Sequence, residues 1–222
     1  MKTQEPDEAA SAAGKSPGMH SRKRLIVLLG ILVVATAIFA WKHFHHRPPG
    51  TGIAVAGGRA MDTRISTPLF KQWDTAWSQQ PLGKSNAPMQ STGCTVCCLA
   101  MALSSKGFPI DPGRLNGQLT AHNGLTSSGL LIWSGVKEVT NGSWRAHVED
   151  RPTHEAIDSQ LAAGNPVIAK VLYDNRVWHW VLITGKSATE YLIHDPLSPG
   201  HEFERMEDYP RGIFAIRYLE KL

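Results

Sequence analysis

The pattern of apolar and polar positions separates one long apolar run near the start of the chain from everything that follows. Residues 25–41 are apolar almost without interruption, the basic residues 22–24 lie just before them, and Trp41 ends the run. A run of this length can just cross a bilayer, and cations on one flank keep that flank in the cytoplasm. The pattern predicts a transmembrane signal anchor over residues 25–41, preceded by a disordered cytoplasmic tail over residues 1–24.

A cleaved secretory signal is the alternative to an anchor. Residues 35–37 read Ala-Thr-Ala, which resembles a small-residue cleavage site after an apolar segment. The anchor is favoured because the apolar run continues past that site. Under both interpretations the rest of the chain lies outside the cytoplasm, in the periplasm or at the cell surface.

The segment after the apolar run has the composition of a linker. Residues 42–64 are rich in glycine and contain a Pro-Pro-Gly sequence together with His43, His45 and His46. These three histidines have no cysteine or acidic companions close by, so we expect no metal site there. The pattern predicts a folded domain over residues 65–222, joined to the anchor by this linker.

The most distinctive element of that domain is a helix without a polar face. Every residue from 96 to 103 is apolar or small, which suits a helix enclosed on all sides. Gly107 can take the left-handed conformation that ends a helix, and Pro109 cannot continue one. Cys94 then lies at the helix start, where free N–H groups and the helix dipole favour a thiolate. Cysteine is also a common small core residue, so this position alone leaves both interpretations open.

Capping and turn residues predict three further helices followed by strands. The helices are expected over residues 111–124, 130–142 and 153–164. Runs of β-branched and aromatic residues, separated by turn residues, predict strands over residues 166–173, 177–184, 190–194 and 213–218. Helices first and strands later predict an α+β domain with the buried helix packed on an antiparallel sheet.

Two of these strands bring a histidine and a carboxylate together. A hairpin turn centred on Ser187 gives the pairs Ile183 with Tyr191, Val181 with Ile193, and His179 with Asp195. A nucleophilic thiol needs a base, and the base needs a group that fixes its tautomer. The hairpin therefore predicts His179 as the base and Asp195 as its orienting group, while His194 points to the other face. A histidine within an aromatic cluster and an aspartate that begins a turn are the structural alternatives.

Composition excludes several other functions. The net charge is +4, but the obvious basic cluster lies beside the apolar run, so it indicates membrane topology and no nucleic-acid partner. The three cysteines, Cys94, Cys97 and Cys98, are too close together to form a disulfide framework across a domain. No further residues are spaced as zinc ligands, and we expect neither a metal nor a cofactor.

An ordered set of motifs resembles a known family. The set comprises Lys71-Gln72-Trp73-Asp74, Gly93-Cys94 with Leu99-Ala100-Met101, Ala162-Ala163-Gly164-Asn165-Pro166-Val167-Ile168, His179-Trp180-Val181 and Ile193-His194-Asp195-Pro196. Over about residues 66–222, the chain is similar to papain-like cysteine peptidases, in particular the group related to the double-glycine leader peptidases of bacteriocin exporters. The resemblance implies a papain-like fold, with Cys94 as nucleophile and His179 as general base and acid. It also implies Asp195 as the orienting group and Gln72 as the oxyanion donor.

The chain departs from the exporter peptidases in two respects. Their glutamine stands only a few residues before the cysteine, whereas Gln72 stands well before Cys94 and Gln90 stands closer. Gln90 is therefore the alternative oxyanion donor. Those domains work in the cytoplasm beside a transporter, whereas this domain is expected to face outward, so leader processing is not implied.

These observations predict a membrane-anchored, outward-facing cysteine peptidase or amidase that works through a Cys-His-Asp triad and a thioester. A peptide or a peptidoglycan-type substrate suits such a location, and transfer of the acyl group to an amine instead of water stays open. One alternative is a thiol–disulfide oxidoreductase, because Cys94 and Cys97 form a C-x-x-C at a helix start. The other is an inactive binding module on the same fold.

Overall fold

The computed structural model describes residues 52–200 and 204–222. The predicted tail, the predicted anchor and residues 42–51 of the predicted linker lie outside these residues. Among the described residues, no helix is both long and apolar enough to cross a membrane.

In the described residues most of the helices precede most of the strands along the chain. The helices are α2 (Met89–Thr92), α3 (Cys94–Ser105), α4 (Pro112–Ala121), α5 (Gly135–Val139) and α6 (His154–Ala162), with a single 3₁₀ turn η1 (Met206–Asp208). The strands are β1 (Thr63–Arg64), β2 (Trp144–Glu149), β3 (Val167–Tyr173), β4 (Val177–Ser187), β5 (Glu190–His194), β6 (Glu204–Arg205) and β7 (Ala215–Lys221).

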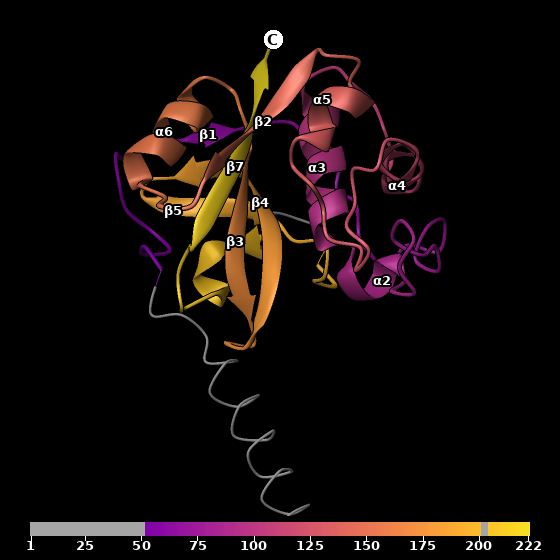
Figure 1. The fold of residues 1–222 in the computed structure, drawn as a ribbon. Helices are drawn as coiled ribbons and strands as arrows, with labels where there is room; N and C mark the ends of the chain where they lie inside the picture. Colours follow the sequence, from indigo (N-terminus) through magenta and orange to yellow (C-terminus); the bar gives the residue numbers. More distant parts are fainter. Residues whose placement is uncertain (1–51, 201–203) are drawn as a thin grey trace, which may run out of the picture. The chain divides into compact units, whose positions relative to one another are not determined.

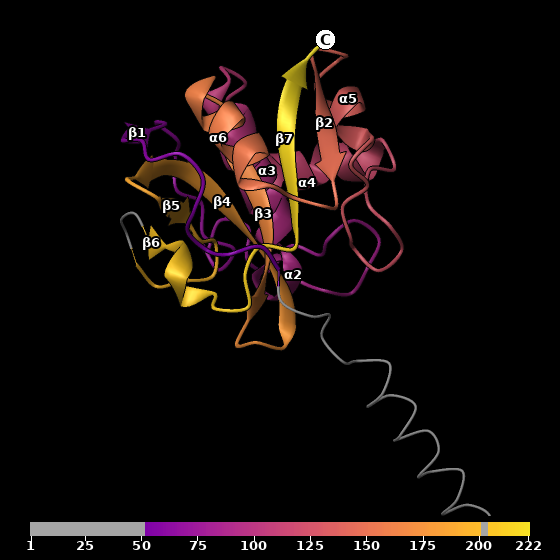
Figure 2. The ribbon, with the colours of Figure 1, turned by 90° about the vertical axis from the view of Figure 1, so that its left-hand side faces the viewer.

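The strands form one antiparallel sheet with helices on both faces. Its order is β2-β7-β3-β4-β5-β6, and β1 pairs with the end of β4. Figure 1 shows α3, α4 and α5 on one side of the sheet and α6 on the other, and Figure 2 shows α6 in front with α3 behind. One apolar core joins α3 to Leu182 and Ile168 of the sheet, and a second joins α6 to the opposite face through Val171 and Val181. This is the α+β arrangement that the sequence predicts.

Helix α3 is buried around its whole circumference, as its lack of a polar face predicts. Nearly all its residues are buried. Lys106 and Gly107 follow its last residue, and Gly107 has a left-handed φ of 78°. Gly93 connects α2 to α3, and a Cβ there would lie 2.5 Å from the backbone oxygen of Met89. Only glycine lets the two helices meet this closely, so Gly93 fixes where α3, and with it Cys94, begins.

Two of the three other predicted helices are confirmed, with the caps that the sequence indicates. The Asp111 side chain accepts a hydrogen bond from Arg114 N at the start of α4, and Thr153 accepts one from Ala156 N at the start of α6. The helix predicted over residues 130–142 is too long, because only Gly135–Val139 is helical. Leu130 is 62% exposed and lies in a loop, just before Leu131, which bridges Leu125. Its spacing with later apolar residues therefore did not reflect a buried helical face.

The hairpin of β4 and β5 forms, but the predicted register is wrong. Ser187 pairs with Glu190, Lys186 with Tyr191, Gly185 with Leu192, Ile183 with Ile193, and Leu182 with His194. A β-bulge at Thr184 separates the last two pairs from the first three. If the pairing continued from Gly185 without this bulge, His179 and Asp195 would face opposite sides of the sheet, since side chains alternate along a strand. The extra residue returns them to the same face.

The predicted linker over residues 42–64 is wrong for its described part, because residues 52–64 pack onto the sheet. Ile53 bridges Ile213, and β1 extends the sheet beside β4. The buried ammonium of Lys186 donates to Gly57 O at 2.6 Å, to Arg59 O at 2.8 Å and to Asp158 Oδ1 at 2.6 Å. A glycine-rich composition resembles a linker, but a buried cation needs fixed oxygen acceptors, and this segment supplies two of them.

Breaking the buried ion pair should loosen this segment. We expect Asp158→Asn to lower the free energy of unfolding by about 3 kcal/mol, because it leaves the Lys186 charge buried without its carboxylate. Chemical denaturation measures this loss. The control is Glu190→Gln, which removes the same charge from a pair with Arg205 whose side chains are 48% and 54% exposed. It should cost less than about 1 kcal/mol; equal losses in the two variants would contradict a role of burial.

Candidate active site

Cys94 is the first residue of α3 and lies where that helix meets the sheet. Its side chain is buried but reaches the surface, with 8% of the residue exposed. Cys97 and Cys98 follow inside the apolar core and are fully buried, and Cys98 Sγ donates to Trp180 O at 3.3 Å. Burial raises the pKa of both thiols well above the ordinary value, so of the three cysteines only Cys94 lies where its thiolate can form.

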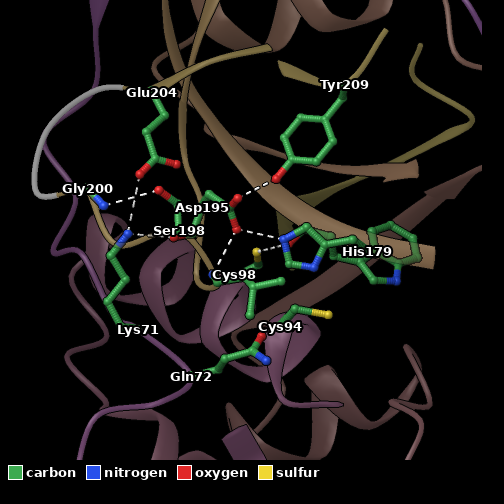
Figure 3. A network of polar contacts seen from close by, with 12 residues as sticks. Lys71, Gln72, Cys94, Cys98, His179, Asp195, Ser198, Gly200, Glu204 and Tyr209 are labelled. Carbon is green, nitrogen blue, oxygen red and sulfur yellow. Dashed lines mark hydrogen bonds and ion pairs between the residues drawn. The ribbon is translucent and has the colours of Figure 1, made fainter. Parts of the chain in front are cut away.

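His179 and Asp195 are joined by a short buried hydrogen bond. His179 Nε2 lies 2.6 Å from Asp195 Oδ1, and the two residues are 4% and 3% exposed. A carboxylate only accepts hydrogen bonds, so Nε2 carries a hydrogen in either protonation state, and Nδ1 is the nitrogen that can take the proton of a thiol. Figure 3 shows the sulfur of Cys94 on the side of the imidazole away from Asp195. The ring therefore lies between the thiol and the carboxylate, as the predicted roles require.

The Asp195 carboxylate is fully satisfied by residues that the sequence analysis did not single out. Oδ1 also accepts from Leu197 N at 2.8 Å, and Oδ2 accepts from the Tyr209 hydroxyl. Burial and the nearby Asp195 carboxylate raise the pKa of Tyr209, which keeps its hydroxyl protonated as a donor. Tyr209 is buried beside η1, in a region without strand or helix periodicity, so no sequence pattern marked it.

Electrostatics favour a charged Cys94–His179 pair. Burial by itself raises the pKa of the Cys94 thiol, but the hydrogen bond and charge of His179 outweigh it and the pKa is lowered. Burial likewise disfavours a charged imidazole, but the hydrogen bonds with Asp195 and Cys94 raise the pKa of His179 to about 9. Burial also acts to raise the pKa of Asp195, yet His179 holds it below the ordinary value. The three groups together stabilise a thiolate beside an imidazolium.

Gln72 lies beside Cys94, as Figure 3 shows. It is 3% exposed, its Nε2 donates to Gln90 O at 2.6 Å, and its Oε1 is a buried atom with no hydrogen-bond partner among the described residues. The side chain of Gln90 is turned elsewhere and accepts from Gln79 Nε2 at 3.1 Å. Gln90 thus holds Gln72 through its backbone, while only Gln72 presents an amide to the site.

The structure also bears on His194 and on metal binding. His194, which was expected on the other face, has its Nδ1 3.0 Å from Thr67 Oγ1, so it contacts neither Cys94 nor His179 through that nitrogen. Within residues 52–200 and 204–222, no group of three or more His, Cys, Asp or Glu side chains is placed to hold a metal ion.

Comparison with known proteins assigns the chain to a family. Residues 64–221 match the model of the Peptidase_C39 like family. The chain belongs to this family. The match covers the sheet and all helices from α2 onward, so the recognised family and the papain-like α+β fold are confirmed.

Solved structures similar to this C39-like chain include two peptidases. A putative C39-like peptidase from Bacillus anthracis is 16% identical, with a TM-score of 0.48, over 72% of this chain and 98% of the other. A double glycine motif protease from an AMS/PCAT transporter, solved with the leader peptide, is 15% identical, with a TM-score of 0.45, over 74% of this chain and 98% of the other. No curated protein matches this chain.

The reactivity of the three cysteines provides a direct test of this site. We expect iodoacetamide to modify Cys94 alone in the folded, full-length protein, at pH values below those that an ordinary thiol needs. In His179→Ala, burial acts on Cys94 without its counter-charge, so the apparent pKa should rise to about 8.5 or above. Mass spectrometry of the alkylated peptides across a pH series measures both effects. Modification of Cys97 at the same rate, or an unchanged pH profile in His179→Ala, would contradict the assignment.

Proposed function

We propose that this chain is a membrane-anchored, outward-facing cysteine peptidase or amidase. The observation that carries the proposal is the buried bond of 2.6 Å between His179 Nε2 and Asp195 Oδ1, with Cys94 on the other side of the ring. This order of thiol, imidazole and carboxylate is what acyl transfer to a cysteine needs. Membership of a peptidase family supports the same reaction class.

The reaction follows from the atoms of the three groups. The Cys94 thiolate attacks the carbonyl carbon of a peptide or amide bond and forms a tetrahedral oxyanion. His179 Nδ1, which carries the proton of the imidazolium, gives it to the leaving amine, and a thioester remains. His179 then accepts a proton from a water molecule that attacks the thioester, and the acid product leaves. Asp195 holds the ring in one tautomer throughout both steps.

Gln72 is the proposed oxyanion donor, together with the N–H of Cys94. One hydrogen of its amide binds Gln90 O, which fixes the orientation of the amide plane. The second hydrogen is then the one that meets the developing negative charge. A donor held in place before the reaction costs no reorganisation when the charge forms, which is why such donors are effective.

The N-terminal sequence supports a proposal for the location and the substrate. The apolar run over residues 25–41 with basic residues before it supports a signal anchor that leaves the domain outside the cytoplasm. Exported peptides and peptidoglycan-type cross-links both suit an outward-facing domain, so we propose these two as the substrate classes.

Substitutions at the proposed triad should separate the roles of its members. We expect Cys94→Ala and His179→Ala to abolish turnover. Asp195→Asn should lose less activity, because an asparagine still orients the imidazole. Gln72→Ala should lower turnover on the order of 10²-fold, the usual effect of one oxyanion donor. The measurement is mass spectrometry of exported peptides and cell-wall fragments after incubation with each protein. Full activity of Cys94→Ala would refute the peptidase mechanism.

Two matched controls sharpen this experiment. Gln90→Ala should retain activity because it contacts Gln72 through its backbone oxygen; a loss there without a loss in Gln72→Ala would reassign the oxyanion donor. Cys97→Ala should also remain active. An oxidoreductase would lose its second thiol in that variant, so inactivity of folded Cys97→Ala would favour that alternative. The complete burial of Cys97 and its raised pKa argue against thiol exchange.

The dependence of turnover on pH should follow the thiolate–imidazolium pair. Activity should rise as pH passes the lowered pKa of Cys94 and fall as pH passes about 9, where His179 loses its proton. Asp195 raises the pKa of His179, so Asp195→Asn should move the basic limb to lower pH. Initial rates across a pH series test this. A basic limb that does not move in Asp195→Asn would show that another group titrates there.

A further inference from the structure

Two short segments that are distant in the sequence run side by side at the site. Lys71 Nζ donates to Asp195 O at 2.8 Å, Gln72 N donates to Pro196 O at 2.9 Å, and Trp73 Nε1 donates to Leu197 O at 3.2 Å. These three successive hydrogen bonds join residues 71–73 to residues 195–197. We call them the clasp.

Lys71 is the buried member of the clasp. It is 7% exposed, and its ammonium also lies 3.5 Å from Glu204 Oε1, as Figure 3 shows. An ammonium held away from water needs acceptors, and the Asp195 carbonyl is the closer of these two. The backbone of Lys71 is fixed as well, because its carbonyl accepts from Trp77 Nε1 at 2.8 Å within the core around α3. The clasp is therefore anchored in the helical part of the domain.

The clasp connects two groups of the proposed mechanism. Gln72 lies in one of its segments, and Asp195 lies in the other. The side chain of Asp195 orients His179, while its backbone oxygen is held by Lys71. The distance between the oxyanion donor and the orienting carboxylate is thus set by short hydrogen bonds, and not by the long stretch of chain between them.

We propose that Lys71 is a positioning residue, which holds the backbone of Asp195 so that its carboxylate faces His179 and stays in register with Gln72. This proposal rests on the proposed function. Without the ammonium, the Asp195 carbonyl loses its donor, the backbone after β5 can shift, and the imidazolium loses its partner. A displacement of the order of 1 Å at such a group is enough to impair a catalytic arrangement.

The test is the pH dependence of Cys94 alkylation by iodoacetamide in the full-length protein, which needs no knowledge of the substrate. We expect Lys71→Met to raise the apparent pKa of Cys94 by about one unit, which slows alkylation about 10-fold at pH values below that pKa. Lys71→Arg should restore part of this rate, because a guanidinium still donates to the Asp195 carbonyl. A purely structural role of Lys71 would lower thermal stability in Lys71→Met and leave the pH profile unchanged.

Lys106→Met is the matched control. Lys106 Nζ also donates to one backbone carbonyl, Gly164 O at 2.7 Å, but it lies just past the far end of α3 from Cys94. Its loss should leave the alkylation profile unchanged. If Lys71→Met folds and keeps the wild-type profile, the proposal for Lys71 is overturned while the proposed function stands.

If Lys71→Met does not fold, Trp73→Phe tests the proposal instead. Trp73 is 44% exposed, and its replacement by phenylalanine breaks only the outer hydrogen bond of the clasp. This variant should slow alkylation by about 3-fold at pH values below the pKa of Cys94, through a smaller displacement, and an unchanged profile would overturn the proposal. If wild-type Cys94 itself shows an ordinary thiol pKa, the proposed function and the role of Lys71 fall together.

Discussion

The burial of α3 on all sides is the constraint on which the rest of the structure depends. A helix without a polar face has to be covered by the sheet on one side and by the smaller helices on the others, and interiors packed this closely do not let an element slide. Cys94 begins this helix, so the packing of α3 fixes the thiol beside the start of β4, where His179 lies. Met89 and Gly93 complete the constraint, because their close contact determines where the helix starts.

A buried thiolate at Cys94 and a buried imidazolium at His179 need hydrogen-bonding partners to offset the cost of removing their charges from water. Burial alone would leave a neutral thiol and a neutral imidazole, since each ion taken out of water costs several kcal/mol. The structure offsets this cost through hydrogen bonds to His179 and to the Asp195 carboxylate. Nε2 of His179 binds Asp195, and both oxygens of that carboxylate are occupied by His179, Leu197 N and Tyr209. The pair is therefore sensitive to geometry well beyond the three groups themselves.

Residues 52–64 form part of the folded domain, although their composition resembles a linker. Residues 52–64 hydrogen-bond to the sheet and to Lys186, so they belong to the folded part. The folded domain therefore begins before residue 65, where the composition predicts its start.

The sequence by itself determined the elements whose signals are local. Uniform apolar character with a glycine and a proline after it specified α3 and the position of Cys94, and capping residues specified α4 and α6. The ordered motifs pointed to His179, Asp195 and Gln72 through the family that they resemble, and the family is confirmed. These features depend on neighbours in the chain or on residue order, and both can be read without coordinates.

Tertiary structure decided what depends on contacts between distant residues. The bulge at Thr184 sets the face on which His179 meets Asp195, and no local turn signal revealed it, because the preference for one register comes from packing on both faces of the sheet. Strand β2, by contrast, has a local signal, because its apolar Trp144, Ala146 and Val148 alternate with polar residues. Tyr209, Lys71 and the segment before β1 gain their roles from hydrogen bonds to residues far along the chain. Such bonds form only once the fold has brought their donors and acceptors together.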